Sequence, residues 1–188
     1  MSENLILNMQ EALGTNIEKI DINDPNLHTP VHPESSDALA QAAIPAVLIG
    51  SLIHLAKQEH PEQYTAQMDQ VFAGKSDEVI DAIAKYAQTT PTEAGDYIAR
   101  TIDAFNRVSQ EQHEGNAKKL MSALENQQND ILRYLPSVLG LGPKLNIDII
   151  DDRTNKMEGP LSSLANFFFN ENIHPKKQDE REEETPPA

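Results

Sequence analysis

Apolar residues recur mostly three and four positions apart along this chain, which is the spacing of one face of an α-helix. The pattern predicts an all-α protein with a compact, bundle-like helical domain over residues 37–170. Residues 1–36 are expected to form a short helix that stops at Gly14 and then an extended arm, both packed against that domain. Residues 171–188 are polar and charged, and this composition predicts a disordered acidic tail.

The most apolar stretch is AAIPAVLIGSLI at residues 42–53, which predicts the central part of the first domain helix. Pro45 either kinks one helix over residues 38–58 or lies in the first turn of a new one. Twelve helical residues span about 18 Å, short of the roughly 30 Å hydrocarbon layer of a bilayer. The stretch is therefore expected to be buried inside the domain rather than in a membrane. Ala46 and Gly50 lie four residues apart, which predicts a groove that another helix approaches closely.

Further helices are predicted by their start and stop signals. One is expected over residues 61–72, and Ser76 is expected to cap the next. Gly115 either divides two later helices or kinks a single long one. The second of these has an apolar face that is interrupted by Gln127 and Gln128.

The clearest local signal is the run Thr90-Pro91-Thr92-Glu93. Thr90 is a natural N-cap, Pro91 suits the first helical position, and Glu93 completes a capping box. The helix that follows is predicted to bury one face and to expose the other, with i,i+4 ion pairs on the exposed face. The expected buried residues are Ile98, Ile102 and Phe105, and the expected pairs are Asp96 with Arg100 and Asp103 with Arg107.

The net charge of −15 at pH 7 is spread along the chain rather than gathered in one block. Spread acidity is typical of a soluble surface, and it repels phosphate backbones and anionic lipids. We therefore expect neither a nucleic-acid partner nor a membrane partner. The chain has no Cys, which excludes disulfides, Cys-ligated zinc and thiol chemistry. Its first residues lack the pattern of a secretory signal, so a cytoplasmic location is expected.

Two apolar runs carry a resemblance to a known family. They are QAAIPAVLIGSL at residues 41–52 and LPSVLGL at residues 135–141. These runs resemble the AIPxLL and LPxLLG stretches of the YidB-like bacterial proteins, a family whose function is obscure. The resemblance implies a helical fold and a bacterial origin, and it implies no activity.

Oxygen-bearing side chains crowd residues 148–158, within a loop that the sequence predicts over residues 140–159. Such side chains are the ligands that Ca²⁺ and Mg²⁺ prefer, so this segment is a candidate divalent-cation site, although its spacing is not that of an EF-hand. The alternative is that Asp152 or Thr154 caps a turn before a last helix over residues 160–169. The candidate ligands are Asp148, Asp151, Asp152, Asn155 and Glu158.

Signatures of catalysis do not occur in the sequence, which has no HExxH, no G-x-S-x-G elbow and no glycine-rich phosphate loop. The pattern therefore favours a non-enzymatic structural or protein-interaction protein that binds a protein partner or associates with itself. The alternatives are a divalent-cation-binding module that uses residues 148–158 and an enzyme with an unrecognised site. No cofactor is expected other than Ca²⁺ or Mg²⁺ at that segment.

Overall fold

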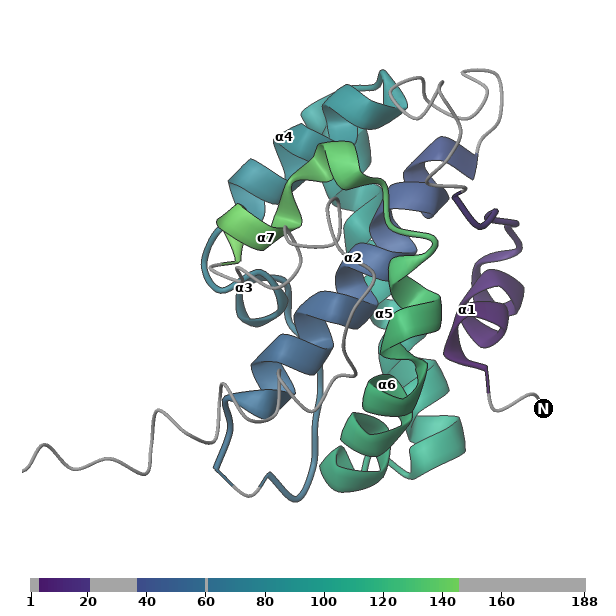
Figure 1. Cartoon of the computed structure of the whole chain (residues 1–188), viewed down its shortest axis with the longest axis vertical. Coiled ribbons are helices and arrows are strands. Elements are labelled where there is room, and N and C mark those ends of the chain that lie inside the picture. Colours follow the sequence, from purple (N-terminus) through teal and green to yellow (C-terminus); the bar gives the residue numbers. More distant parts are fainter. Residues whose placement is uncertain (1–3, 21–36, 60, 146–188) are drawn as a thin grey trace, which may run out of the picture. The chain divides into compact units, whose positions relative to one another are not determined.

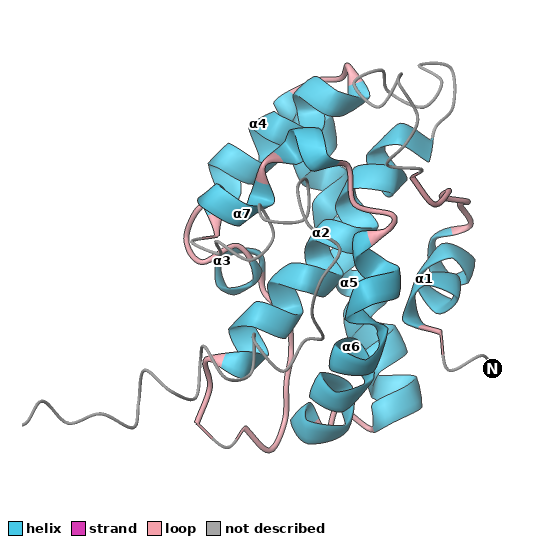
Figure 2. Cartoon of the chain, viewed as in Figure 1, coloured by secondary structure: helices cyan, strands magenta, loops and turns pink. Residues whose placement is uncertain are grey.

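The structure is a computed structural model that describes residues 4–20, 37–59 and 61–145 (Figure 1). It confirms the predicted all-α fold, because these residues form helices and none of them forms a strand (Figure 2). In chain order the elements are α1 (Leu5–Leu13), α2 (Asp37–Ala56), α3 (Met68–Val71), α4 (Ser76–Ala87), α5 (Pro91–His113), α6 (Ala117–Leu132), a 3₁₀ turn η1 (Ser137–Leu139) and α7 (Leu141–Lys144).

The helix α2 is central to the packing and contacts α1, α3, α4, α5 and α6 (Figure 1). It is one continuous helix of 20 residues with Pro45 inside it, so Pro45 does not start a new helix. By length and composition Ala38–Ala56 is long and apolar enough to cross a membrane, so the apolar part of the helix is longer than the stretch at residues 42–53 on which the sequence argument relied. Yet 89% of the apolar window is buried inside the fold, which confirms the predicted core helix.

The helix α5 begins as its sequence predicts. Thr90 Oγ1 accepts a hydrogen bond from Glu93 N at 3.2 Å, and the Glu93 carboxylate accepts one from Thr90 N at 3.3 Å. This capping box satisfies two main-chain N–H groups that the first helical turn leaves without partners. The predicted inward face is confirmed as well, because its three residues are at most 5% exposed: Ile98, Ile102 and Phe105.

The outward face of α5 is exposed as predicted, but the expected ion pairs are not among those that the described residues form. Arg100 Cζ lies 4.9 Å from the centroid of the Tyr97 ring instead of pairing with Asp96. A cation–π contact at an exposed site gives a stabilisation as small as that of an exposed ion pair, so neither arrangement is strongly preferred. The four exposed side chains are Asp96, Arg100, Asp103 and Arg107.

The prediction of a helix over residues 61–72 was wrong for all but its last part, α3. Residues 61–67 are not helical, because their main chain pairs with the turn between α5 and α6, through an isolated antiparallel bridge from Gln63 to Asn116, instead of with itself. Tyr64 N donates to Gly115 O at 3.1 Å, and Ala117 N donates to Glu62 O at 3.2 Å.

The Asn106 side chain adds a second clamp on this extended segment. Its Oδ1 accepts a hydrogen bond from Ala66 N at 2.8 Å, and its Nδ2 donates to Ala66 O at 3.0 Å. Burial alternates along the segment as in a strand, with Tyr64 and Ala66 buried and Thr65 exposed between them. This period of two was the sequence signal for an extended segment, and the helical spacing of Tyr64 and Met68 concealed it.

Two helix ends differ in detail from their prediction. Ser76 is the first residue of α4 rather than its cap, and Lys75 occupies the cap position. The Ser76 hydroxyl instead donates a hydrogen bond to Asp69 Oδ1 at 2.8 Å. Gly115, at φ +66°, lies between α5 and α6, so it divides two helices rather than kinking one.

The short helix α7 lies where the sequence predicted only a loop. Leu141 and Leu145 are both 2% exposed, and Leu145 N donates to Leu141 O at 2.8 Å. Burial of these two leucines stabilises one helical turn, which packs near α4. The rest of that loop, the helix expected over residues 160–169 and the predicted tail lie outside the described residues.

Candidate functional site

The predicted cation site, at residues 148–158, lies outside the described residues. Within the residues that are described, no three His, Asp or Glu side chains come close enough together to hold a metal ion. The candidate ligands concerned are Asp148, Asp151, Asp152, Asn155 and Glu158.

The N-terminal segment, defined here as residues 4–20, docks on the helical domain at a site that the sequence did not reveal. Its helix α1 packs against α2, α5 and α6 (Figure 1). The inward side chains Leu5, Ile6 and Met9 are at most 1% exposed. The helix ends at Gly14, which has φ +65° and is the stop that the sequence predicted. Beyond Gly14 the chain leaves the helix and runs on without regular secondary structure to the end of the segment.

Gln41, on α2, holds this non-helical part of the N-terminal segment by its main chain. Its Oε1 accepts a hydrogen bond from Glu18 N at 2.9 Å, and its Nε2 donates one to Glu18 O, also at 2.9 Å. The same Nε2 donates to Tyr134 O at 2.7 Å, just after α6. Gln41 is only 4% exposed, so these bonds are largely shielded from water. One buried amide therefore joins the N-terminal segment, α2 and the end of α6.

Two further glutamines bind main-chain N–H groups of the segment. Gln127 Oε1 accepts from Leu5 N at 2.7 Å, and Gln10 Oε1 accepts from Ile17 N at 2.8 Å. Leu5 N belongs to the first turn of α1, where helical N–H groups have no partner within the helix. Gln127 is one of the residues that interrupt the apolar face predicted for α6, and that interruption was the sequence signal for this contact.

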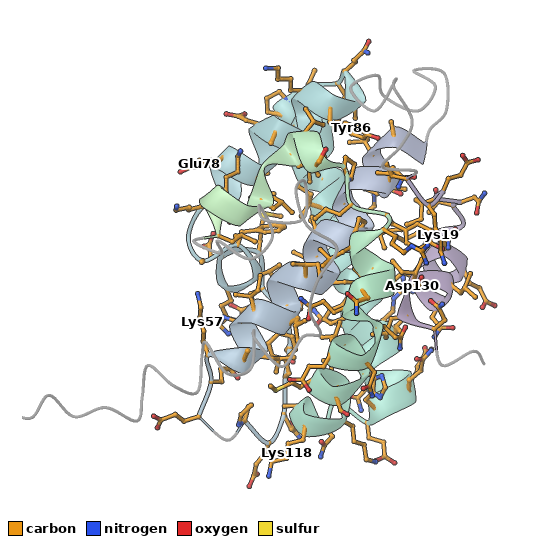
Figure 3. The ribbon with its side chains drawn as sticks, viewed as in Figure 1. Lys19, Lys57, Glu78, Tyr86, Lys118 and Asp130 are labelled. Atoms are coloured by element: carbon orange, nitrogen blue, oxygen red, sulfur yellow. The ribbon has the colours of Figure 1, made fainter. Side chains whose placement is uncertain are left out.

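The end of the segment is held by one main-chain bond and one lysine. Ile20 N donates to Arg133 O at 2.7 Å. Lys19 Nζ lies 2.7 Å from Asp130 Oδ1 (Figure 3). It also lies 5.6 Å from the centroid of the Tyr134 ring. The two paired side chains are 47% and 33% exposed, and such pairs stabilise by at most about 1 kcal/mol. The lysine contacts therefore orient the segment more than they anchor it.

These contacts form a site that binds a non-helical polypeptide mainly through its backbone. Main-chain groups of Glu18 and Ile20 make hydrogen bonds to the domain, Ile17 N bonds to Gln10 within the segment, and only Ile17 is buried in this part, at 5% exposure. Recognition of this kind draws affinity from the backbone and specificity from a few side-chain pockets.

No protein-family model, curated protein or solved structure matches this chain. The resemblance to the YidB-like proteins therefore stays a prediction. One hydrogen bond joins the first run to the residue just before the second. Gln41 opens the run over residues 41–52, and its amide binds the main chain of Tyr134, which directly precedes the run over residues 135–141.

A second group of polar side chains lies where α2 meets the extended chain before α3. The ring centroids of His54 and Tyr64 are 5.9 Å apart, and Tyr64 meets Phe105 edge-on at 6.4 Å. Gln58 Nε2 lies 2.6 Å from His54 Nε2. Ser51, three residues before His54 on α2, is fully buried. The group connects α2, α5 and the extended chain.

Burial sets the protonation of this group. It raises the pKa of the Tyr64 phenol, a rise that the Ser51 hydroxyl partly offsets. Burial also lowers the pKa of His54, the Lys57 ammonium lowers it further, and the main chain of Gln70 acts in the opposite direction. Both groups are therefore mainly neutral at pH 7. Because Ser51 is 0% and Tyr64 6% exposed, these side chains support packing rather than contact with an external substrate.

Proposed function

We propose that this protein is a non-enzymatic protein-interaction protein whose helical domain binds polypeptide segments at the site that its own N-terminal segment occupies. The observation that supports this most directly is the pairing of the Gln41 amide with both main-chain groups of Glu18. An amide that pairs with the N–H and C=O of one residue is indifferent to that residue's side chain. Segments of different sequence fit such a contact, and the buried position of Ile17 adds a preference for an apolar side chain.

The partner that we propose is a protein, which includes a second copy of this chain, and not nucleic acid or lipid. The net charge of −15 opposes binding to phosphate backbones and anionic headgroups. A cytoplasmic location and a bacterial origin, the latter from the YidB-like resemblance, complete the proposal.

A labelled peptide with the sequence of residues 1–20 tests this function on the full chain. Met9→Asp combined with Ile17→Asp weakens docking of the chain's own segment and leaves the domain side of the site unchanged. We expect saturable binding of the peptide to this double variant and little binding to the unaltered chain, whose site is filled. If the double variant lacks a cooperative melt, the peptide is tested instead on Ile17→Asp alone, which keeps the apolar face of α1.

Gln41→Met provides the matched control, because it keeps the length of the side chain and removes all three hydrogen bonds of the amide. Added to the segment variant, it should abolish most of the peptide binding. Equal binding with and without Gln41, or no binding to a folded segment variant, contradicts the proposed function.

A further inference from the structure

We infer that the N-terminal segment of one copy of this chain docks on the helical domain of a second copy, so that two copies exchange these segments. The inference rests on the proposed function, because it names the polypeptide that fills the same site in trans. It is carried by the docking contacts together with the length of chain that joins the segment to the domain.

The docking contacts do not involve the residues that connect the segment to the domain. They join residues far apart in sequence: Leu5 N and Gln127 are separated by 122 positions, and Lys19 and Asp130 by 111. Each of these two bonds has one partner in the segment and the other in the domain, as do the bonds of Glu18 with Gln41 and of Ile20 N with Arg133 O. A segment from a second chain therefore makes the same bonds, and reciprocal exchange closes a two-fold dimer.

The connection is long enough for exchange. Sixteen residues, 21–36, join the segment to α2, and a chain of that length spans at most roughly 50–60 Å. A helical domain of about 110 residues is expected to have a radius of gyration of about 13 Å. The segment can therefore reach the equivalent site on an adjacent copy.

Apolar side chains on both the segment and the domain are buried by docking, so the site stays filled whether the segment comes from the same chain or from a second copy. Leu5, Ile6 and Met9 are at most 1% exposed when docked, and a released segment would expose them together with the facing surfaces of α5 and α6. The docked contacts are equivalent within one chain and between two chains. Protein concentration therefore decides the population of exchanged dimer.

The cysteine-free sequence permits a specific cross-linking test on the full chain. One variant carries Lys19→Cys and another Asp130→Cys, at two side chains that are partly exposed and lie 2.7 Å apart when docked. Equal amounts are unfolded in denaturant, refolded together at high concentration and treated with a short bis-maleimide cross-linker. We expect covalent dimers, because about half of the exchanged dimers contain one chain of each kind. Light scattering of the unaltered chain after the same refolding should show the dimer mass.

Asp103→Cys, at an exposed position of α5, replaces Asp130→Cys as the control for random collisions and should give little product. A yield with Asp130→Cys no higher than that control, or only monomer in light scattering, overturns the exchange. If the labelled peptide still binds in that case, the proposed function stands and the exchange alone is wrong. If the peptide also fails to bind, both are wrong.

Discussion

Gly50 on α2 touches Val71 so closely that no side chain fits between them. A Cβ atom built on Gly50 would lie 2.5 Å from the carbonyl oxygen of Val71 and 2.6 Å from its Cγ1. Val71, the last residue of α3, is 2% exposed. The sequence predicted a close approach along Ala46 and Gly50, and this contact confirms it at Gly50.

Gly50→Ala is therefore expected to destabilise the protein, although alanine is the better helix former. The new methyl group meets main-chain atoms of Val71, which have to shift, and such overpacking costs typically about 1–3 kcal/mol. Gly95→Ala on α5 is the matched control, because its Cβ would meet only Ile80 Cδ1 at an ordinary 3.6 Å. That change should be neutral or stabilising by up to about 1 kcal/mol. Denaturant unfolding measures both, and equal effects at the two glycines would contradict the close contact.

Thr90→Ala is expected to lower the free energy of unfolding by roughly 0.5–2 kcal/mol, because it leaves the N–H of Glu93 without its capping acceptor. Thr92→Ala, at an exposed position two residues later, should change stability by less than about 0.5 kcal/mol. Thermal or denaturant melts of the two variants provide the comparison. An effect at Thr92 as large as that at Thr90 would show that the capping box is not the cause.

The features that the sequence predicted correctly depend on residues near one another in the chain. The capping box joins Thr90 to Glu93, and the inward face of α5 repeats within single helical turns. Gly14 ends α1 by its own left-handed conformation. Signals of this kind are complete within a short window, so pattern and propensity suffice to read them.

The features that the sequence missed depend on distant partners. Residues 61–67 are not helical because Gly115 and Asn106 supply hydrogen bonds that a helix would otherwise supply internally. Gln41 binds partners 23 and 93 residues away, and no local pattern marks a glutamine for that role. The candidate site was therefore unpredictable in detail, although Gln127 within an apolar face gave a partial signal.

Phe105→Ala is expected to destabilise the protein by roughly 3–5 kcal/mol, because the ring is fully buried and its loss leaves a cavity. Val138→Ala is the control: Val138 is 57% exposed, so its truncation should have little effect. Chemical denaturation with unchanged slope would show that the change is in stability rather than in the unfolded state. A small effect at Phe105 would contradict its central position in the core.

The two alternatives for residues 148–158 are separated by calorimetry. Because the spacing is not that of a known cation loop and Arg153 and Lys156 offset part of the acidic charge, we expect the capping alternative. Chelator-treated protein should give no heat with Ca²⁺ or Mg²⁺ at about 1 mM, the weak end of protein calcium sites. Heat that disappears when Asp151 and Asp152 are both changed to Asn would establish the cation site instead.

The pKa shifts of two histidines determine how the stability of the protein is expected to depend on pH. Burial lowers the pKa of His54 and of His113 below the ordinary value of 6.5, and the nearby Lys57 and Lys119 respectively lower each further. The folded protein therefore resists a proton that the unfolded chain accepts near pH 6.5. It follows that the contribution of these two histidines to stability is constant above this pH and declines as the pH falls below it, because the unfolded state then binds more protons.

Unfolding midpoints measured between about pH 5 and pH 8 test this sign. His54→Gln combined with His113→Gln should flatten the profile in this window while leaving a loss at lower pH. That remaining loss arises from Glu93 and Glu114, whose carboxyl pKa values are held below the ordinary 4.5 by the Thr89 hydroxyl and by Lys119 respectively. Both carboxylates are fully exposed, so their contribution is small and confined to more acidic solution. A midpoint that rises as the pH falls from 7 to 5 would show that the imidazoles are stabilised in their charged form, opposite to the effect of their burial.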